Sequence, residues 1–181
     1  MGLKIIVWGT GNVGRPAIRA VLGNPELELV GVVVANPDKV GRDAGDIVGL
    51  PATGVVATDD AAAVLAGDVD CVVYTATADI RPEEAMTDLL DCLNAGTNVV
   101  STSFYSFLHP ASQPAELLAP INAACEKSGA SLFVSGIDPG WAMDMLPIAL
   151  SPAVSNVREY RCREIFNYAL YDQPQVVREV I

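Results

Sequence analysis

Short runs of β-branched and other apolar residues alternate along the chain with stretches whose apolar residues recur at helical spacing. The apolar runs predict six strands, at residues 3–8, 27–35, 55–58, 70–75, 97–101 and 130–135. The helical spacing predicts helices between them, at residues 12–22, 59–66, 81–94 and 114–128. This alternating order predicts an α/β fold: a doubly wound parallel sheet of the Rossmann type, with right-handed crossovers.

The last part of the chain follows a different pattern. From Tyr160 to Tyr168, mostly aromatic or apolar residues alternate with mostly polar ones at a period of two. This pattern is typical of an antiparallel strand with one polar face. A single strand cannot form a sheet with itself. We therefore expect residues 1–150 to form the Rossmann domain. Residues 151–181 would then begin a second, α+β domain for substrate binding or dimerisation, truncated in this chain.

Composition limits the classes of partner. Of 181 residues, 51% are hydrophobic and 18% are charged, so the chain can bury a core and disorder is not expected. A net charge of −11 would repel nucleic acid and anionic membranes, so we expect neither as a partner. A cofactor that carries phosphates can still bind, provided that local N–H groups and a few basic side chains meet its charge.

Targeting signals and cysteine motifs are not evident. No apolar run approaches the length that spans a bilayer, and the N-terminus does not read as a secretion signal. Four cysteines are spread through the chain without a CxxC pair. Buried free thiols in a cytoplasmic protein are the interpretation we favour, and we expect no metal site.

A glycine-rich loop follows the first predicted strand and opens the first predicted helix. In a Rossmann fold the first glycine permits a tight turn, the second lets the backbone approach a pyrophosphate, and the third lets the helix pack close to the strand. The N-terminus of the helix adds N–H groups and partial positive charge. A glycine turn that serves only packing is the alternative, but the strand and helix around the loop favour a dinucleotide site. The loop reads Gly9-Thr10-Gly11-Asn12-Val13-Gly14.

The end of the second predicted strand indicates which dinucleotide binds. Enzymes that use NAD usually place an acidic residue there to accept hydrogen bonds from the ribose hydroxyls. This chain has Ala35-Asn36-Pro37, with Lys39 and Arg42 just beyond. An amide donor and two cations suit a 2′-phosphate, although a solvated basic loop would look the same. We therefore expect NADP(H) to be preferred, with NAD(H) possible.

Further cofactor contacts are expected where the later strands end, because ligands of open α/β sheets bind at the carboxyl ends of the strands. Thr75, Ala76 and Thr77 follow the fourth strand, and Ser101, Thr102 and Ser103 end the fifth. Asp138 lies in a glycine- and proline-rich turn after the sixth strand. That turn could contact the nicotinamide or could only reverse the chain.

Two side chains are candidates for proton transfer. His109, the only histidine, lies in an aromatic segment after the fifth strand, and an imidazole can exchange protons near neutral pH. A surface histidine before a proline is the alternative interpretation. Tyr105 in the same segment is the second candidate, although aromatic residues there could also pack around a pocket.

Several segments together resemble proteins with a dihydrodipicolinate reductase-like N-terminal domain, in the branch of 2,4-diaminopentanoate dehydrogenase and the NAD(P)H-dependent amine dehydrogenases. The resemblance implies an oxidoreductase that reduces a C=N or C=O bond of a small substrate, with a second domain that makes a homodimer. It also implies that residues 9–13 bind the pyrophosphate, and that Asn36, Lys39 and Arg42 bind the adenosine phosphate. The segments are Ile5–Gly11, Asn36–Gly45, Asn98–Thr102 and Asp138–Asp144.

The chain departs from this branch at one place. Amine dehydrogenases carry a glutamate shortly after the strand that matches residues 98–102, whereas Phe104 and Tyr105 occupy that stretch here. This departure favours a neutral carbonyl or alcohol substrate, with Tyr105 or His109 as the proton donor. A non-catalytic protein that senses NADP(H) is the alternative to an enzyme.

Overall fold

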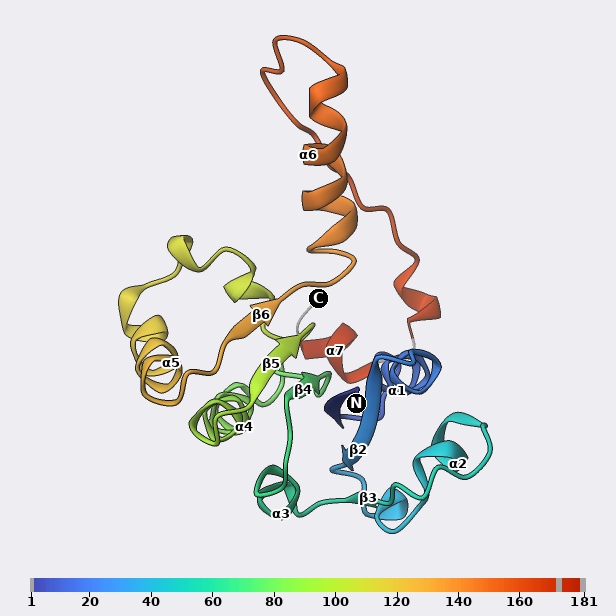
Figure 1. The fold of residues 1–181 in the computed structure, drawn as a ribbon. Coiled ribbons are helices and arrows are strands. Elements are labelled where there is room, and N and C mark those ends of the chain that lie inside the picture. The colour runs from blue at the N-terminus through green and yellow to red at the C-terminus, as the bar shows by residue number, and fades with distance from the viewer. Residues whose placement is uncertain (1, 172–173, 180–181) are drawn as a thin grey trace.

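The computed structural model describes residues 2–171 and 174–179, and it contains one six-stranded sheet with helices on both faces (Figure 1). The strand order is β3-β2-β1-β4-β5-β6, and every neighbouring pair is parallel. This arrangement confirms the predicted Rossmann fold. The strands are β1 (Leu3–Trp8), β2 (Leu27–Val33), β3 (Ala57–Thr58), β4 (Cys71–Tyr74), β5 (Asn98–Ser101) and β6 (Leu132–Val134).

Alternate residues of the strands belong to two separate cores, one on each face of the sheet. On β1, Ile5 and Val7 pack with helices α1 (Gly14–Gly23) and α2 (Ala44–Val48). Ile6 and Trp8 face the opposite core, which includes residues of α4 (Pro82–Asn94) and α5 (Ala115–Ser128). Burial on both faces explains why the strands read as continuous apolar runs.

The remaining helical segments are short. Helix α2 was not predicted, because five residues are too few to show a helical period. It begins after Asp43, whose side chain accepts a hydrogen bond from Gly45 N, and it ends at Gly49, which is left-handed with φ 70°. The others are α3 (Ala61–Leu65), α6 (Leu146–Leu150), α7 (Pro174–Glu179), a π-helical turn at Trp141–Met145, and 3₁₀ turns at Pro37–Lys39, Tyr105–Leu108, Pro110–Ser112, Ser151–Ala153 and Tyr168–Leu170.

The strand predicted from Tyr160 to Tyr168 is wrong. Residues 157–167 form neither strand nor helix and are exposed, and Tyr168 begins a 3₁₀ turn. A strand needs a neighbour to satisfy its N–H and C=O groups, and residues 157–167 pair with none of the six strands of the sheet. Figure 1 shows the π-helical turn and α6 extending away from the sheet, with the chain returning beside them. Across the described residues, no helix is long and apolar enough to cross a membrane.

Candidate functional site

The glycine-rich loop joins β1 to α1, and its three glycines have different surroundings. Gly9 has φ 102°, a conformation that favours glycine, and a Cβ there would lie 2.8 Å from Ala76 N. A Cβ on Gly14 would lie 2.0 Å from Gly9 O, inside the loop itself. A Cβ on Gly11 would meet no atom within 4 Å. Gly9 and Gly14 are therefore required by the protein's own packing, whereas Gly11 leaves an open backbone surface.

A cleft of about 650 Å³ lies against this loop, at the carboxyl ends of the central strands. This volume falls in the range of small-molecule and cofactor sites. Most of the cofactor residues expected from the sequence line it: Gly9, Thr10, Gly11, Asn12, Val13, Asn36, Lys39, Thr75, Ala76 and Thr77. The structure therefore brings together residues from three separate loops around one cavity.

The lining also includes residues that were not expected from the sequence. They come from the segments after β3 and β4, from α4 and from the C-terminal segment, and a single motif does not mark them. They include Asp59, Ala61, Ala78, Asp79, Arg81, Asp88, Tyr171 and Val176. Thr102 and Ser103, which the sequence did predict after the fifth strand, also line the cleft.

Lys39 connects the loop after β2 to the glycine-rich loop. Its Nζ donates hydrogen bonds to Thr10 O at 2.9 Å and to Thr10 Oγ1 at 3.0 Å. Partial burial lowers the pKa of Lys39, and the nearby charges of Arg15 and Arg42 lower it further. Arg15 and Arg42 therefore both lie close enough to repel Lys39 beside the glycine-rich loop, and a bound anion would relieve this repulsion.

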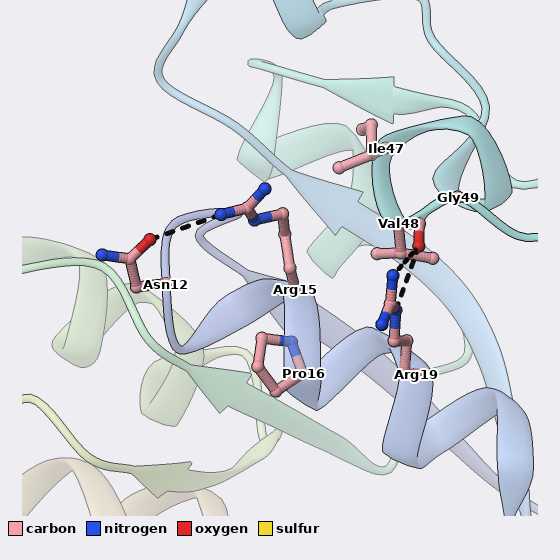
Figure 2. Close-up of a pocket in the computed structure, with 7 residues that line it drawn as sticks. All are labelled: Asn12, Arg15, Pro16, Arg19, Ile47, Val48 and Gly49. Atoms are coloured by element: carbon pink, nitrogen blue, oxygen red, sulfur yellow. Dashed lines mark hydrogen bonds between the residues drawn. The ribbon is translucent and has the colours of Figure 1, made fainter. Parts of the chain in front are cut away.

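Arg15 is the one cation beside the glycine-rich loop, of the three just described, that was not predicted from the sequence. It borders a second hollow of about 490 Å³, between α1 and α2, which Figure 2 shows. In Figure 2 Arg15 hydrogen-bonds to Asn12, and Arg19 donates to the carbonyl oxygen of Val48. The position of Arg15, directly after the last glycine of the loop, was the sequence signal that could have identified it.

Hydroxyl groups at the ends of β4 and β5 form hydrogen bonds with backbone carbonyl groups of the adjacent strands and of the glycine-rich loop. Thr75 Oγ1 lies 3.0 Å from Trp8 O and 3.2 Å from Gly9 O, so it fixes the start of the glycine-rich loop. Ser101 is 1% exposed; its Oγ donates to Tyr74 O at 3.1 Å and accepts from Ser103 N. Ser101 itself does not line the cleft, whereas the two residues after it do.

The candidate proton donors are separated by the structure. Tyr105 lines the cleft, and a hydrogen bond with the Asp79 carboxylate, together with partial burial, raises the pKa of its hydroxyl. His109 is exposed and lies outside the cleft lining, between two 3₁₀ turns. Arg42 and Asp138 also lie outside the lining. Tyr105 is therefore the better placed of the two candidates.

Asp138 has a carboxylate neighbour of its own. A hydrogen bond with Asp138, and the negative charge of that residue, raise the pKa of Glu164. The structure thus places Asp138 beside another acid, in a turn that contains the cis peptide bond to Pro139.

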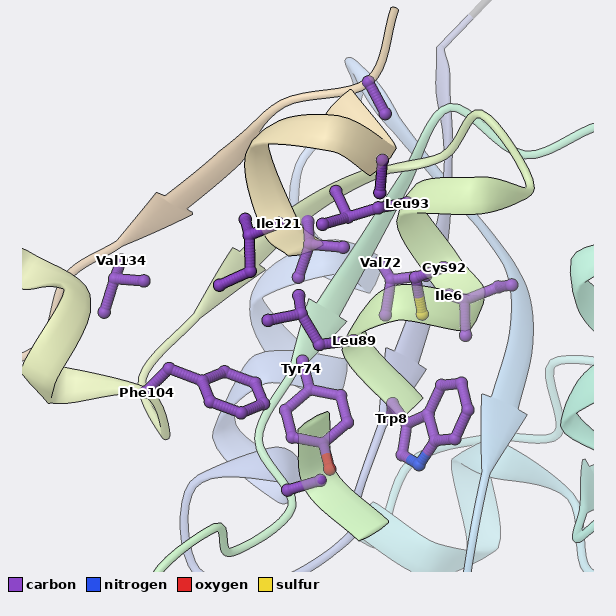
Figure 3. Packing of buried hydrophobic residues seen from close by; sticks show 14 of the residues in the cluster. Ile6, Trp8, Val72, Tyr74, Leu89, Cys92, Leu93, Phe104, Ile121 and Val134 are labelled. Atoms are coloured by element: carbon purple, nitrogen blue, oxygen red, sulfur yellow. The ribbon is translucent and has the colours of Figure 1, made fainter. Parts of the chain in front are cut away.

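Beneath the cleft, three aromatic rings lie in a row, and the middle one carries a polar cluster. Tyr74 is fully buried between Trp8 and Phe104, with ring centroids 5.6 and 5.2 Å away (Figure 3). Its hydroxyl donates to Asp88 Oδ2 at 2.8 Å. Arg81 Nη1 donates to the same carboxylate oxygen at 2.9 Å and to the Tyr74 hydroxyl at 3.0 Å. We refer to Tyr74, Arg81 and Asp88 as the Tyr74 cluster.

The open surface over Gly11 gives a first prediction. We expect Gly11→Ala to leave thermal stability unchanged, because its Cβ would meet no protein atom. We expect it to weaken dinucleotide binding about tenfold, since overpacking typically costs 1–3 kcal/mol where a ligand backbone must approach closely. Titration of cofactor fluorescence and a melting curve check the two parts. An unchanged affinity would show that no pyrophosphate approaches Gly11.

Comparison with known proteins supplies the family. The sequence profile of the family described as "Dihydrodipicolinate reductase, N-terminus" matches residues 3–105. The chain is 48% identical over 180 residues to an amine dehydrogenase of Streptomyces virginiae, covering 99% of this chain and 50% of that protein. It is 26% identical over 192 residues to the 2,4-diaminopentanoate dehydrogenase of Acetoanaerobium sticklandii, covering 98% of this chain and 50% of that protein.

A solved structure agrees with this assignment. The amine dehydrogenase from Mycobacterium smegmatis superposes with a TM-score of 0.72 at 29% identity, covering 87% of this chain and 46% of that chain. The chain spans about half the length of these curated relatives. The chain belongs to the dihydrodipicolinate reductase N-terminal domain family, and it resembles the amine dehydrogenases and 2,4-diaminopentanoate dehydrogenase among its relatives.

Proposed function

We propose that this protein is an NADP-dependent oxidoreductase that reduces a C=O or C=N bond of a small substrate. The observation that carries the proposal is the cleft of about 650 Å³, which joins the glycine-rich loop to the ends of β2, β4 and β5. The dehydrogenase and reductase relatives imply a nicotinamide cofactor, which would supply hydride when bound. The likeness to amine dehydrogenases supports a C=N substrate, formed from a carbonyl and ammonia or an amine.

The lining of the cleft fits the parts of such a cofactor. The open backbone at Gly11 and the N-terminus of α1 suit the pyrophosphate. Lys39 and Arg42 in the loop after β2, with Arg15 at the start of α1, place positive charge beside the glycine-rich loop. Asp38, the first carboxylate beyond β2, lies outside the cleft lining. This charge distribution favours a 2′-phosphate over a free ribose hydroxyl.

At the other end of the cleft, Tyr105 and Asp79 face the space that follows β4 and β5. The hydroxyl of Tyr105 can donate a proton to the oxygen or nitrogen of the bond that is reduced. Asp79 keeps that hydroxyl protonated by raising its pKa. Asp79 also places a carboxylate in the cleft. This carboxylate can attract an ammonium or iminium group, and so it can take the place of the glutamate that this chain lacks after β5.

A direct experiment tests the activity. The protein would be mixed with NADPH and a panel of ketones and aldehydes, with and without ammonium, and NADPH oxidation would be followed by absorbance. Turnover that needs ammonium would identify an amine dehydrogenase, and turnover without it a carbonyl reductase. Saturable binding without turnover of any substrate would favour the NADP(H) sensor over the enzyme.

Cofactor preference can be tested at Lys39. We expect Lys39→Ala to reduce the ratio of NADPH to NADH affinity about tenfold, because a hydrogen bond to a charged group is worth about 1.5–3 kcal/mol. Lys127→Ala, which removes the same charge from the exposed end of α5, is the matched control and should leave the ratio unchanged. Because the pKa of Lys39 is lowered, the preference for NADPH should also decline as pH rises toward that pKa. An equal loss for both cofactors would show that Lys39 only holds Thr10 in place.

A further inference from the structure

The hollow between α1 and α2 lies outside the cofactor cleft (Figure 2). Its volume of about 490 Å³ falls in the range of sites for small molecules. Among the residues that the structure describes, Asn12 is the one residue that lines both the hollow and the cleft. Lys39, which is expected to bind the cofactor, does not line the hollow. The hollow is therefore a separate candidate site for a ligand.

Two arginines of α1 border this hollow. Arg15 and Arg19 are four residues apart in the helix, so their side chains lie on one face, about one turn from each other. Figure 2 shows both side chains leaving α1 on the same side. Both residues are exposed, and the described lining of the hollow contains no acidic residue. The hollow thus has two positive charges on its wall without a carboxylate in the described lining.

The hydrogen bonds of the two arginines do not neutralise their charges. Arg15 Nη2 donates to Asn12 Oδ1 at 3.4 Å, which is a long and weak hydrogen bond. Arg19 donates to the carbonyl oxygen of Val48 through Nε, at 3.0 Å, and through Nη2. Both acceptors are neutral, and within residues 2–171 and 174–179 neither arginine forms a salt bridge. In a chain with a net charge of −11, such a local excess of positive charge marks a place that attracts anions.

A purely structural role accounts for Arg19 but not for Arg15. Val48 is the last residue of α2, and a cation beside the C-terminal carbonyl groups of a helix is favourable. Arg15 lies in the first turn of α1, where a positive charge opposes the helix dipole. Its hydrogen bond goes to Asn12, three residues earlier, so it does not join α1 to another element. A bound anion would explain an arginine at this position.

The rest of the wall and the chemistry of the guanidinium group indicate the kind of anion. Pro16 and Ile47 give the hollow an apolar surface. Gly49, with φ 70°, presents no side chain there, and a Cβ on it would lie 3.8 Å from Arg19 Nη2. Guanidinium groups bind phosphate and carboxylate oxygens in bidentate pairs. A phosphate monoester carries a charge of about −1.5 to −2 at pH 7, so it matches two arginines better than a singly charged carboxylate does.

We propose that the hollow between α1 and α2 binds a small phosphate monoester, with its phosphate between the guanidinium groups of Arg15 and Arg19. The organic part of the ester lies against Pro16 and Ile47. This site does not depend on the proposed function, because neither arginine lines the cofactor cleft.

Calorimetric titration with phenyl phosphate, inorganic phosphate and benzoate tests the site, at low salt because salt screens exposed charges. We expect saturable binding that is tightest for phenyl phosphate, which has both the double charge and an apolar group. Arg15→Gln and Arg19→Gln should each weaken it about tenfold, as for the loss of a hydrogen bond between charged groups. Arg163→Gln, at an exposed position outside the hollow lining, removes the same charge and should leave the affinity unchanged.

Lys39→Ala separates the hollow from the cofactor cleft, where a phosphate could also bind. Binding that is lost in Lys39→Ala but retained in both glutamine variants would place the anion in the cleft and overturn the proposal. Absence of saturable binding to the native protein, or equal affinities for benzoate and phenyl phosphate, would also overturn it. Should Arg19→Gln fail to fold, as judged by circular dichroism, a loss in Arg15→Gln with binding retained in Lys39→Ala would still support the hollow.

Discussion

Gly14→Ala is expected to destabilise the protein by about 3 kcal/mol or more, enough to prevent folding of a marginally stable domain. The new Cβ would lie 2.0 Å from Gly9 O, 2.6 Å from the Gly9 carbonyl carbon and 2.8 Å from Thr75 Oγ1. Backbone atoms of a short loop cannot move aside without changing its path. Helix propensity has the opposite sign, since alanine is more favourable than glycine within a helix by roughly 0.5–1 kcal/mol. The clash therefore outweighs the propensity.

Urea denaturation of the native protein, Gly14→Ala and Gly11→Ala would measure this effect. Gly11→Ala is the matched control, because the same methyl group is added three residues earlier in the loop without a clash. The midpoint should fall sharply for Gly14→Ala and stay unchanged for Gly11→Ala. An unchanged midpoint for Gly14→Ala would mean that α1 does not pack against the loop as closely as the structure has it.

The fold could be predicted from the sequence because each strand and each long helix carries its own local signal. Residues 5–8 are apolar on both faces, and this part of β1 is indeed buried between two cores. The glycine spacing after that strand predicted where the cleft would open. The strand at Tyr160–Tyr168 shows the limit of such signals. Its alternating pattern is real, but a strand also needs a pairing partner, and pairing is not a local property.

The site was predictable only where one motif contains it. The glycine-rich loop and the loop after β2 are contiguous segments, so their residues could be identified together. Tyr74 ends strand β4, Arg81 precedes the first turn of α4, and Asp88 lies two turns into the same helix. Only the packing of α4 on the sheet brings their polar atoms within 3.0 Å of one another. Asp79 likewise became a candidate only through its contact with Tyr105.

Removal of the Tyr105 hydroxyl is expected to have the largest effect on turnover. If Tyr105 donates the proton, Tyr105→Phe should reduce kcat/KM by about a hundredfold or more, the usual contribution of general acid catalysis. Binding of NADPH should change little, because the glycine-rich loop and Lys39 are untouched. Steady-state kinetics on the best substrate of the panel, with a separate cofactor titration, would check both parts.

The pH profile and a second variant decide whether the proton comes from this hydroxyl. Asp79 raises the pKa of Tyr105, so the protonated donor persists to higher pH than in a free tyrosine, and activity should decline only above that range. Asp79→Asn removes the negative charge, lowers this pKa and should move the alkaline decline to lower pH. His109→Asn is the matched control, since His109 lies outside the cleft lining and its loss should leave the profile unchanged. If His109→Asn abolished turnover and Tyr105→Phe did not, the proton would come from the histidine, and the 3₁₀ turns around it would have to approach the cleft when substrate binds.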